Sequence, residues 1–410
     1  MRKRLIACML TTALLLIGCA VYAVYTTQTL PPAPETGAPA ANSAASSAAL
    51  PPPVIKLQFA GDVLLHSGPI KAASKGDNRY DFDPFFERID PFVDGDLALC
   101  NVETPIDVFG GNRELSTYPR FNAPYEILPT LKKIGFNFFV NANNHSFDKR
   151  WDGLLATKEN FKKAGVAATG TYASQEDYDR YRIVDVKGIK VGIIAYTDAV
   201  NGLEQAIPEE RRGYAIRRFS SADTADVPRM IADMEACRAA GAEFIILSLH
   251  WGWEYRDAPT DAQREIAALL CKGGADVLMG SHSHCVQPVE WFPGKDGGRS
   301  LCAFSLGNFF ADQYGLQKPM HKTQFSMLLS ATVTRGENGR TVIETADYLP
   351  TFTYRARTGG GNYYSLVPAG VYTRSDFYSS SGWDMYREAS AHVTKIAGDS
   401  VPVFQGATGT

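Results

Sequence analysis

Apolar segments alternate with helical periodicity from residue 54 to about residue 285. Continuous apolar runs are typical of strands that are buried on both faces. Such runs predict strands at 54–60, 97–100, 136–140, 243–249 and 275–279. Apolar residues spaced three or four apart predict helices at 125–134, 153–164, 226–240 and 261–272. Strands and helices in alternation predict an α/β fold that is built in layers.

Two features depart from the alternation of strands and helices. A hairpin is predicted at 182–196, with its turn at Lys187-Gly188. Later strands are predicted at about 286–292, 301–306, 323–335 and 341–348, with no helices between them. Such a run predicts a mixed sheet or a second sheet. We therefore assign one domain to 54–350 and treat 351–410, which is rich in Tyr, Gly and Ser, as an extension packed on it.

Residues 1–28 are typical of a membrane anchor. Arg2, Lys3 and Arg4 precede 21 uncharged positions, 5–25. A helix of that length spans a bilayer core of about 30 Å, and its basic flank stays in the cytoplasm. The segment 16–19, Leu-Ile-Gly-Cys, supports a second interpretation, a lipoprotein signal whose Cys19 is lipidated. Both interpretations place the rest of the chain outside the cytoplasm, at the cell membrane.

Composition adds three expectations. Residues 29–53 consist mainly of Pro, Ala, Ser, Thr and Gly, which predicts a flexible linker. The formal net charge of −3 gives no electrostatic basis for a nucleic-acid partner. Five of the seven cysteines lie outside the anchor without CxxC spacing, so we expect small buried residues, and one disulfide stays open.

Polar side chains gather at the ends of the five strands predicted between 54 and 279. In chain order they are Asp62, Glu103, Asn144 with His145, His250, and His282 with His284. Ligands of α/β sheets bind beyond the carboxyl ends of the strands, so these side chains are expected to converge. Carboxylate oxygens with imidazole nitrogens suit Zn²⁺, Mn²⁺ or Fe²⁺. Two such ions need a bridging carboxylate and can clamp the attacking and leaving oxygens of phosphoryl transfer.

Each polar residue taken alone has an ordinary structural explanation. A Gly-Asp pair after a strand is common, and a single histidine at a strand end usually makes structural hydrogen bonds. His282 and His284 carry more weight, because alternate residues of an extended strand point to the same face. The ordered set of five clusters predicts one site for one or two divalent ions.

This ordered set resembles the calcineurin-like metallophosphoesterases, whose pattern is Asp-x-His, Gly-Asp, Gly-Asn-His-Asp/Glu, His and Gly-His-x-His. It is more closely similar to the CapA/PgsA family of poly-γ-glutamate capsule synthesis proteins. The similar stretches are 59–65, 101–105, 142–148, 250–255, 280–284 and 305–309. The resemblance covers roughly 54–315, and it implies a four-layer αββα sandwich of the metallophosphoesterase type.

The resemblance also implies a role for each residue of the site. The metal ligands would be Asp62 and His284 at a first position, Asn144, His250 and His282 at a second, and Glu103 as the bridge. His145 would donate a proton to the leaving oxygen or stabilise charge on the transferred group. Asp148 would orient the imidazole of His145.

The chain departs from the wider superfamily at two positions. Leu64 stands where the Asp-x-His pattern has a histidine, and His66 is a nearby candidate to replace that ligand. The bridge is Glu103 rather than an aspartate, because the literal pair Gly95-Asp96 precedes its strand and lies at the wrong end of the sheet. A site with one metal, or an inert site, therefore stays open.

The resemblance implies work at the cell surface in poly-γ-glutamate capsule synthesis. The leading hypothesis is a metal-dependent hydrolase or phosphoesterase-like enzyme that acts on an anionic polymer or a phosphoester. A non-catalytic export or assembly factor and a general surface phosphoesterase are the alternatives. Other capsule-synthesis membrane proteins are expected partners. Trp251, Trp253 and Tyr255 predict either core packing or a wall for an extended substrate.

Overall fold

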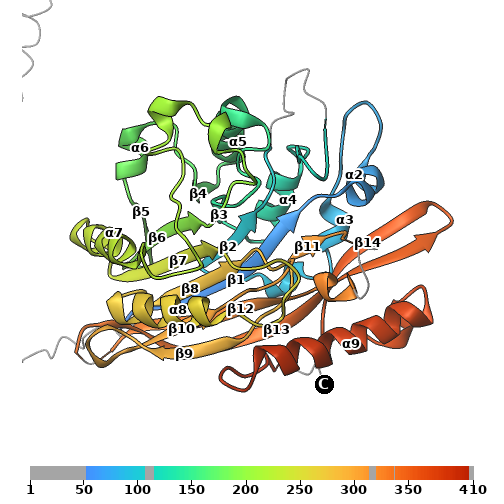
Figure 1. The fold of residues 1–410 in the computed structure, drawn as a ribbon. Helices are drawn as coiled ribbons and strands as arrows, with labels where there is room; N and C mark the ends of the chain where they lie inside the picture. The colour runs from blue at the N-terminus through green and yellow to red at the C-terminus, as the bar shows by residue number, and fades with distance from the viewer. Residues whose placement is uncertain (1–51, 107–114, 314–319, 337, 406–410) are drawn as a thin grey trace, which may run out of the picture. The chain divides into compact units, whose positions relative to one another are not determined.

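The computed structural model describes residues 52–106, 115–313, 320–336 and 338–405. The anchor and nearly all of the linker lie outside these residues, so both stay predictions. No helix among the residues described is long and apolar enough to cross a membrane. The described chain, which belongs to the unit Pro51–Thr410, is built on two sheets (Figure 1).

The larger sheet has eight strands, and its order joins early and late parts of the chain. Its path is β14 (Gly361–Pro368), β13 (Thr341–Thr358), β12 (Phe325–Arg335), β1 (Val54–Leu64), β2 (Leu97–Val102), β3 (Phe138–Val140) and β4 (Ala167–Thr169), while β11 (Phe310–Ala311) pairs with β1. Strands β1 to β4 run parallel, and β12 to β14 are antiparallel to their neighbours. The predicted boundary at residue 350 therefore falls inside β13, and the last two strands belong to the main sheet.

The smaller sheet has six strands. Its order is β5 (Arg182–Val186), β6 (Ile189–Thr197), β7 (Phe244–His250), β8 (Val277–Ser281), β10 (Arg299–Ala303) and β9 (Val289–Pro293). Strands β6, β7, β8 and β10 are parallel, and β5 and β9 are antiparallel edge strands. The predicted hairpin at 182–196 is confirmed. The late strands of the described chain form no separate sheet, because β12 and β13 join β1 in a mixed larger sheet and β9 and β10 join the smaller one.

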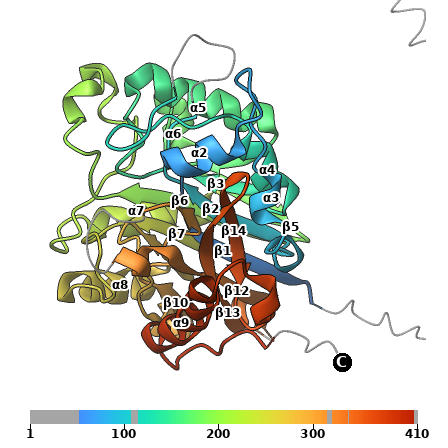
Figure 2. The same cartoon turned by 90° about the vertical axis from the view of Figure 1, so that its right-hand side faces the viewer.

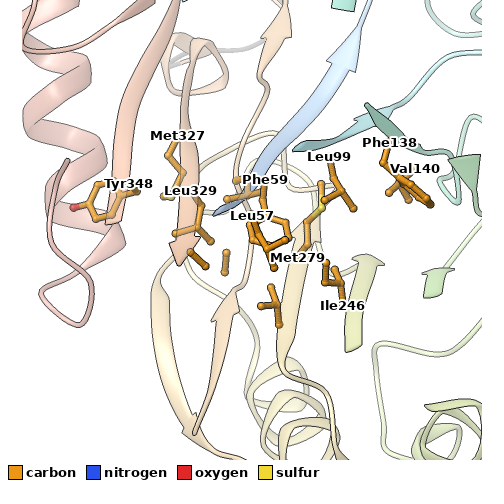
Figure 3. Close-up of a cluster of buried hydrophobic side chains, with 14 of the residues drawn as sticks. Leu57, Phe59, Leu99, Phe138, Val140, Ile246, Met279, Met327, Leu329 and Tyr348 are labelled. Carbon is orange, nitrogen blue, oxygen red and sulfur yellow. The ribbon is translucent and has the colours of Figure 1, made fainter. Parts of the chain in front are cut away.

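The two sheets pack face to face over a shared apolar core. Leu57, Phe59 and Leu99 of the larger sheet lie in one cluster with Ile246 and Met279 of the smaller sheet (Figure 3). The larger sheet packs its other face against α2 (Ser67–Ala73), α3 (Asp83–Phe86), α4 (Ile127–Lys133) and α5 (Arg150–Ala164). The smaller sheet packs its other face against α7 (Val227–Ala239) and α8 (Asp261–Gly273). This helix–sheet–sheet–helix order is the α/β sandwich that was expected.

One long helix near the end of the described chain packs on the face of the larger sheet that also contacts the smaller sheet. Helix α9 (Ser380–Ala397) packs on β13 and β12, below the larger sheet in Figure 1. Its buried residues Tyr386, Ala389 and Val393 belong to the same core that joins the two sheets. Helix α9 lies beside β12 and β13 (Figure 2), and its buried residues therefore cover apolar surface of the larger sheet. The other helices of the described chain are α6 (Gln175–Asp179) and short 3₁₀ turns at Asp90–Phe92, Glu204–Ala206, Glu209–Arg211, Lys295–Gly297, Met320–Gln324 and Arg374–Asp376.

The cysteines of this part of the chain fill the core. Cys100, Cys237, Cys271, Cys285 and Cys302 are all buried with free thiols. Burial raises the pKa of the Cys237 thiol to about 11, so it stays protonated at neutral pH. These residues therefore act as small apolar side chains, as predicted.

Candidate metal centre

The parallel strands of both sheets carry the predicted ligands at their carboxyl ends. Glu103 follows β2 directly, His250 is the last residue of β7, and His282 follows β8 directly. Asp62 lies near the end of β1, where the pairing with β2 shifts register between Ala60 and Asp62. The strand ends are tied together by the backbone, since Glu103 N–H donates to the Val63 carbonyl over 3.1 Å. The convergence expected from five separate motifs is therefore present, although the strands belong to two sheets.

The structure brings the carboxylates and three imidazoles into two overlapping groups. Asp62, Glu103 and His284 form the first group, and Glu103, His250 and His282 form the second. Within each group the possible ligand atoms lie within 4.8 Å of one another. Glu103 belongs to both groups, which is the position that a bridging carboxylate requires.

The second group is the tighter of the two. The Nε2 atom of His250 lies 2.9 Å from Asn144 Oδ1, 3.1 Å from His282 Nδ1 and 3.4 Å from Glu103 Oε1. Two ligands at right angles on an ion, each at about 2.1 Å, are about 3 Å apart. The spacing of the second group therefore fits a single divalent ion, with Asn144 as a further donor.

The first group is more open. His284 Nδ1 lies 3.7 Å from Asp62 Oδ2 and 3.9 Å from Glu103 Oε2. Asp62 is held in place by Asn101, whose Nδ2 donates to Asp62 Oδ1 over 2.7 Å. Asn143 donates in turn to Asn101 Oδ1 and to the Val102 carbonyl. This chain of amides orients the carboxylate of Asp62 toward the site.

Burial makes the charged state of the two carboxylates costly. Glu103 is fully buried, and neither of its carboxylate oxygens accepts a hydrogen bond from the residues described. Burial, together with the neighbouring Glu103, raises the pKa of Asp62 to about 8. Burial also raises the pKa of Glu103, although the nearby His284 opposes this shift. Of the two carboxylates only Asp62 accepts hydrogen bonds from amide groups. Two adjacent buried carboxylates are unfavourable unless a cation compensates them.

The imidazoles have the opposite preference. Burial, and then the neighbouring histidines, hold the pKa of His250 and of His282 well below the ordinary value. Both rings are therefore neutral at physiological pH, which is the form that binds metal. Neutral imidazoles and uncompensated carboxylates together fit a site for divalent ions.

His145 and Asp148 form a separate pair beside the two groups. His145 Nδ1–H donates to Asp148 Oδ2 over 2.7 Å, and the same oxygen accepts the backbone N–H of Phe121 over 2.8 Å. This arrangement leaves Nε2 as the reactive nitrogen of the ring. Burial disfavours a charge on His145, but the hydrogen bond to Asp148 and the nearby Glu103 raise its pKa above the ordinary value. A protonated imidazole held in one orientation suits proton donation.

Two positioning residues were missed by the sequence reasoning. Ser281 Oγ lies 2.9 Å from His250 Nδ1, on the side of the ring away from Asn144. Asn201, in the loop after β6, accepts a hydrogen bond from Asn144 Nδ2 over 3.2 Å. This contact turns Asn144 Oδ1 toward His250. Asn201-Gly202 has the composition of an ordinary turn, so the sequence carries no signal for this role.

The two histidines after β8 do not follow the alternation of a strand, so the prediction that they share one face was wrong. Strand β8 ends at Ser281, and His282 and His284 adopt positive φ angles of 94° and 57°. They therefore do not point to one face of a strand. The turn sends His282 to the second group and His284 to the first. Non-glycine residues in this conformation are strained, and such strain gathers at functional sites.

The two departures from the superfamily pattern, one at β1 and one at β2, are resolved differently. Leu64 is buried in a small apolar cluster with Phe121 and Ala311. His66 lies outside both groups, because its Nδ1 faces the Leu64 carbonyl at 3.2 Å and its ring packs against Phe121. Asp96 lies at the opposite end of β2, where it binds Lys187 and the backbone of Lys56, as predicted.

The three aromatic residues after β7 divide between core and rim. Trp251 is buried, and its Nε1–H donates to the Phe304 carbonyl over 3.0 Å. Trp253 is 68% exposed and Tyr255 is 36% exposed. The Tyr255 ring lies 5.9 Å from the His284 ring, so it borders the first group.

Comparisons with known proteins agree with the motifs. Residues 56–313 match the family described as bacterial capsule synthesis protein PGA_cap. The chain is 25% identical over 262 residues to the PGA biosynthesis protein CapA of Bacillus subtilis, covering 63% of this chain and 64% of that protein. It is 26% identical over 240 residues to the capsule biosynthesis protein CapA of Bacillus anthracis, covering 58% and 56%. A probable polyglutamine synthesis accessory protein of Mycobacterium tuberculosis is 27% identical over 253 residues, covering 60% and 64%.

These alignments span between 56% and 64% of the length of the curated relatives. Among solved structures, the NAD nucleotidase NadN of Haemophilus influenzae aligns with a TM-score of 0.43 and 14% identity, covering 85% of this chain and 64% of that one. A likeness at this level supports no conclusion about fold or activity. The family match covers more than half of the chain, and the chain belongs to the bacterial capsule synthesis protein family PGA_cap.

Proposed function

We propose that this protein is a metal-dependent hydrolase or transferase that acts at the cell surface on poly-γ-glutamate or on a phosphoester. The observation that carries the proposal is the environment of Glu103. Its buried oxygens accept no hydrogen bond from the described chain, and the residue belongs to both ligand groups. A buried carboxylate of this kind destabilises the fold, and an apolar residue in its place would be more stable. Its presence therefore supports a site that holds a cation. The names of the relatives support a role in polyglutamate capsule synthesis.

Two divalent ions would be held by Asp62, His284, Asn144, His250 and His282, with Glu103 between them. When bound, they would supply Lewis acidity and a positive field for an anionic substrate. His145, with Nδ1 fixed by Asp148, presents Nε2 and donates a proton to the leaving oxygen. Asn201 holds the side chain of Asn144 and so keeps its oxygen directed at the second position.

The experiment is a turnover assay on the purified protein loaded with Mn²⁺ or Zn²⁺. A chromogenic phosphodiester and poly-γ-glutamate serve as the two substrates. His145→Ala is expected to lose turnover while it keeps the metal content of the wild type, because His145 lies outside both ligand groups. His66→Ala is the matched control, since His66 is a nearby buried histidine that is also outside the groups. Wild-type protein that binds metal and turns over neither substrate contradicts the proposal.

The second candidate is a non-catalytic export or assembly factor. Leu64 and the wider spacing of the first group favour it, because an incompletely held ion catalyses poorly. In that case the site binds the polymer without cleaving it. Polymer binding that depends on metal but survives in His145→Ala, together with no turnover, supports this candidate.

We further propose that the domain lies outside the cytoplasm and is tethered by residues 1–28, beside other membrane proteins of capsule synthesis. Labelling with a fatty acid separates the two tethers. Label that is lost in Cys19→Ala indicates a lipoprotein, and membrane association without label indicates a transmembrane anchor.

A further inference from the structure

The first group has a neighbour that none of the metal assignments above uses. Asn308 lies between β10 and β11, and β11 pairs with the end of β1 through Val63↔Phe310 and Leu64↔Ala311. The Gly307 carbonyl also accepts the backbone N–H of Asp62 over 3.0 Å. This close approach requires glycine at position 61, where a Cβ atom would lie 1.8 Å from the Gly307 oxygen. The backbone therefore places Asn308 directly beside Asp62.

The amide of Asn308 has a fixed orientation. Asn308 is fully buried, and its Nδ2 donates to the Thr323 carbonyl and to Gln313 Oε1, both over 2.9 Å. A backbone carbonyl only accepts hydrogen bonds, so Nδ2 must point to Thr323 and Oδ1 must point the other way. Oδ1 lies 3.0 Å from His284 Nδ1.

The same nitrogen of His284 faces the two carboxylates of the first group. His284 Nδ1 is the atom that lies 3.7 Å from Asp62 and 3.9 Å from Glu103. An ion bound there needs the lone pair of Nδ1, so Nδ1 would no longer donate a proton to Asn308. An oxygen lone pair and a nitrogen lone pair 3.0 Å apart repel each other unless a cation lies between them.

The second group shows the same arrangement. Asn144 Oδ1 lies 2.9 Å from His250 Nε2, close to the separation of Asn308 Oδ1 from His284 Nδ1. Both separations fit two ligands at right angles on one ion with bonds of about 2.1 Å. Each position then combines one amide oxygen, the shared Glu103 and at least one imidazole.

We propose that Asn308 Oδ1 is a ligand of the first metal position, where it supplies the donor that Leu64 does not. The proposal rests on the metal site of the proposed function and completes its weaker half. Asp62, Glu103, His284 and Asn308 then form a four-donor set of oxygen and nitrogen. Such a set suits Mn²⁺, Fe²⁺ or Zn²⁺.

Metal counting on the metal-free protein tests the proposal. Wild type, Asn308→Ala and Asn144→Ala are titrated with Mn²⁺, and bound ions are counted by elemental analysis and by the spin coupling of paired ions. Wild type is expected to bind two coupled ions. Asn308→Ala is expected to keep one and to bind the other more than about 100-fold more weakly, beyond the 10- to 100-fold effect of an outer contact. Asn144→Ala, in the second group, is also expected to lose the coupling.

The matched control is Asn160→Ala. Asn160 is another buried asparagine that donates to a backbone carbonyl, that of Ile106, but it lies outside the ligand groups. It is expected to bind both ions as the wild type does. Two coupled ions in Asn308→Ala with affinity within about tenfold of wild type would overturn the proposal, as would a wild type that binds fewer than two.

A direct measurement covers the case in which Asn308→Ala does not fold. Wild-type crystals soaked in Mn²⁺ are expected to show anomalous density within bonding distance of Asn308 Oδ1. An ion held by Asp62 and Glu103 but more than about 3.5 Å from that oxygen would reject the assignment. Two bound ions without turnover would reject the proposed function and leave Asn308 as a ligand. Turnover by the wild type, together with two bound ions in Asn308→Ala, would reject Asn308 as a ligand and leave the proposed function in place.

Discussion

At the scale of single residues, Glu103 reduces the stability of the metal-free fold. Its carboxylate is fully buried, lies beside Asp62 and accepts no hydrogen bond from the described residues. Uncompensated burial of a polar group costs about 1–3 kcal/mol, and more when the group is charged. Glu103 therefore lowers the free energy of unfolding of the metal-free protein, and metal binding offsets this loss.

Glu103→Gln is expected to stabilise the metal-free protein by about 1–3 kcal/mol and to weaken metal binding. Because the folded pKa of Glu103 is raised, wild-type stability falls as pH rises above the ordinary value of 4.5. The advantage of the variant should therefore be absent near pH 4 and grow toward pH 7. Urea unfolding in the presence of a chelator measures this difference in the free energy of unfolding between variant and wild type. The exposed Glu87→Gln is the control, and a destabilised Glu103→Gln at pH 7 would contradict the expected cost of the buried charge.

Asp148 acts on chemistry through His145. Asp148→Asn removes the charge that helps to raise the pKa of His145, and it weakens the hold on Nδ1. We expect turnover to fall by about 10- to 100-fold with unchanged metal content, and the alkaline limb of the pH profile to move to lower pH. Asp152→Asn, an exposed change on α5, is the matched control. An unchanged pH profile would mean that Asp148 has only a structural role.

The sequence could predict the identity of the site residues but not which of the two ligand groups each residue belongs to. Asp62, Glu103 and His250 follow from apolar runs that end in polar residues, and such runs depend on local burial alone. The separation of His282 from His284 depends on two positive φ angles, which no periodicity reveals. The contacts of Asn201 and Asn308 depend on loops that meet only in the folded protein.

At the scale of elements, Asp177 joins the segments beyond β4. Its carboxylate pairs with Lys158 of α5 at 2.9 Å and with Arg182 of β5, and it accepts the backbone N–H of Ala173. Burial opposes its charge, but the hydrogen bonds from Ala173 and Lys158, with Arg182, lower its pKa to about 2. One side chain on a short helix therefore links a long helix to the edge of the smaller sheet.

Asp177→Asn is expected to destabilise the protein by about 1–2 kcal/mol at pH 7, allowing for partial solvent screening. A lowered folded pKa gives stability that is present above the ordinary value of 3.8 and is lost as pH falls toward 2. The difference between variant and wild type should therefore shrink below about pH 3.8. Urea unfolding across pH 3 to 7 measures it, with Asp179→Asn on the same helix as control. A difference that is independent of pH would show that charge is not the cause.

The elements near the end of the chain could not be placed from the sequence, because their burial depends on pairing with other strands. Helix α9 has buried residues at helical spacing, among them Tyr386, Ala389 and Val393, but this spacing does not specify the strands β12 and β13 on which the helix packs. Strand β14 carries tyrosines and a serine whose burial depends on pairing with β13. The strands near the site are continuous apolar runs, and these were predicted within a few residues.

At the scale of the whole molecule, the candidate centre lies where two sheets meet. Asp62 and Glu103 come from the larger sheet, and His250 and His282 come from the smaller one. The backbone of His282 also donates to Asp62 Oδ2 over 3.3 Å, which links the two sheets at the site. An ion held by both sets of ligands would therefore connect the two halves of the sandwich.

Metal binding should consequently stabilise both sheets together. Ions at a free concentration of 100 times their Kd add about 2.7 kcal/mol per site to the free energy of unfolding. We expect a single melting transition that moves to higher temperature on addition of Mn²⁺ and returns on chelation. Hydrogen exchange should slow at the carboxyl ends of β1 and β2 and of β7 and β8 alike, because opening either sheet breaks the ligand set. Slowing confined to one sheet would show that the ligands of the other do not hold the ion.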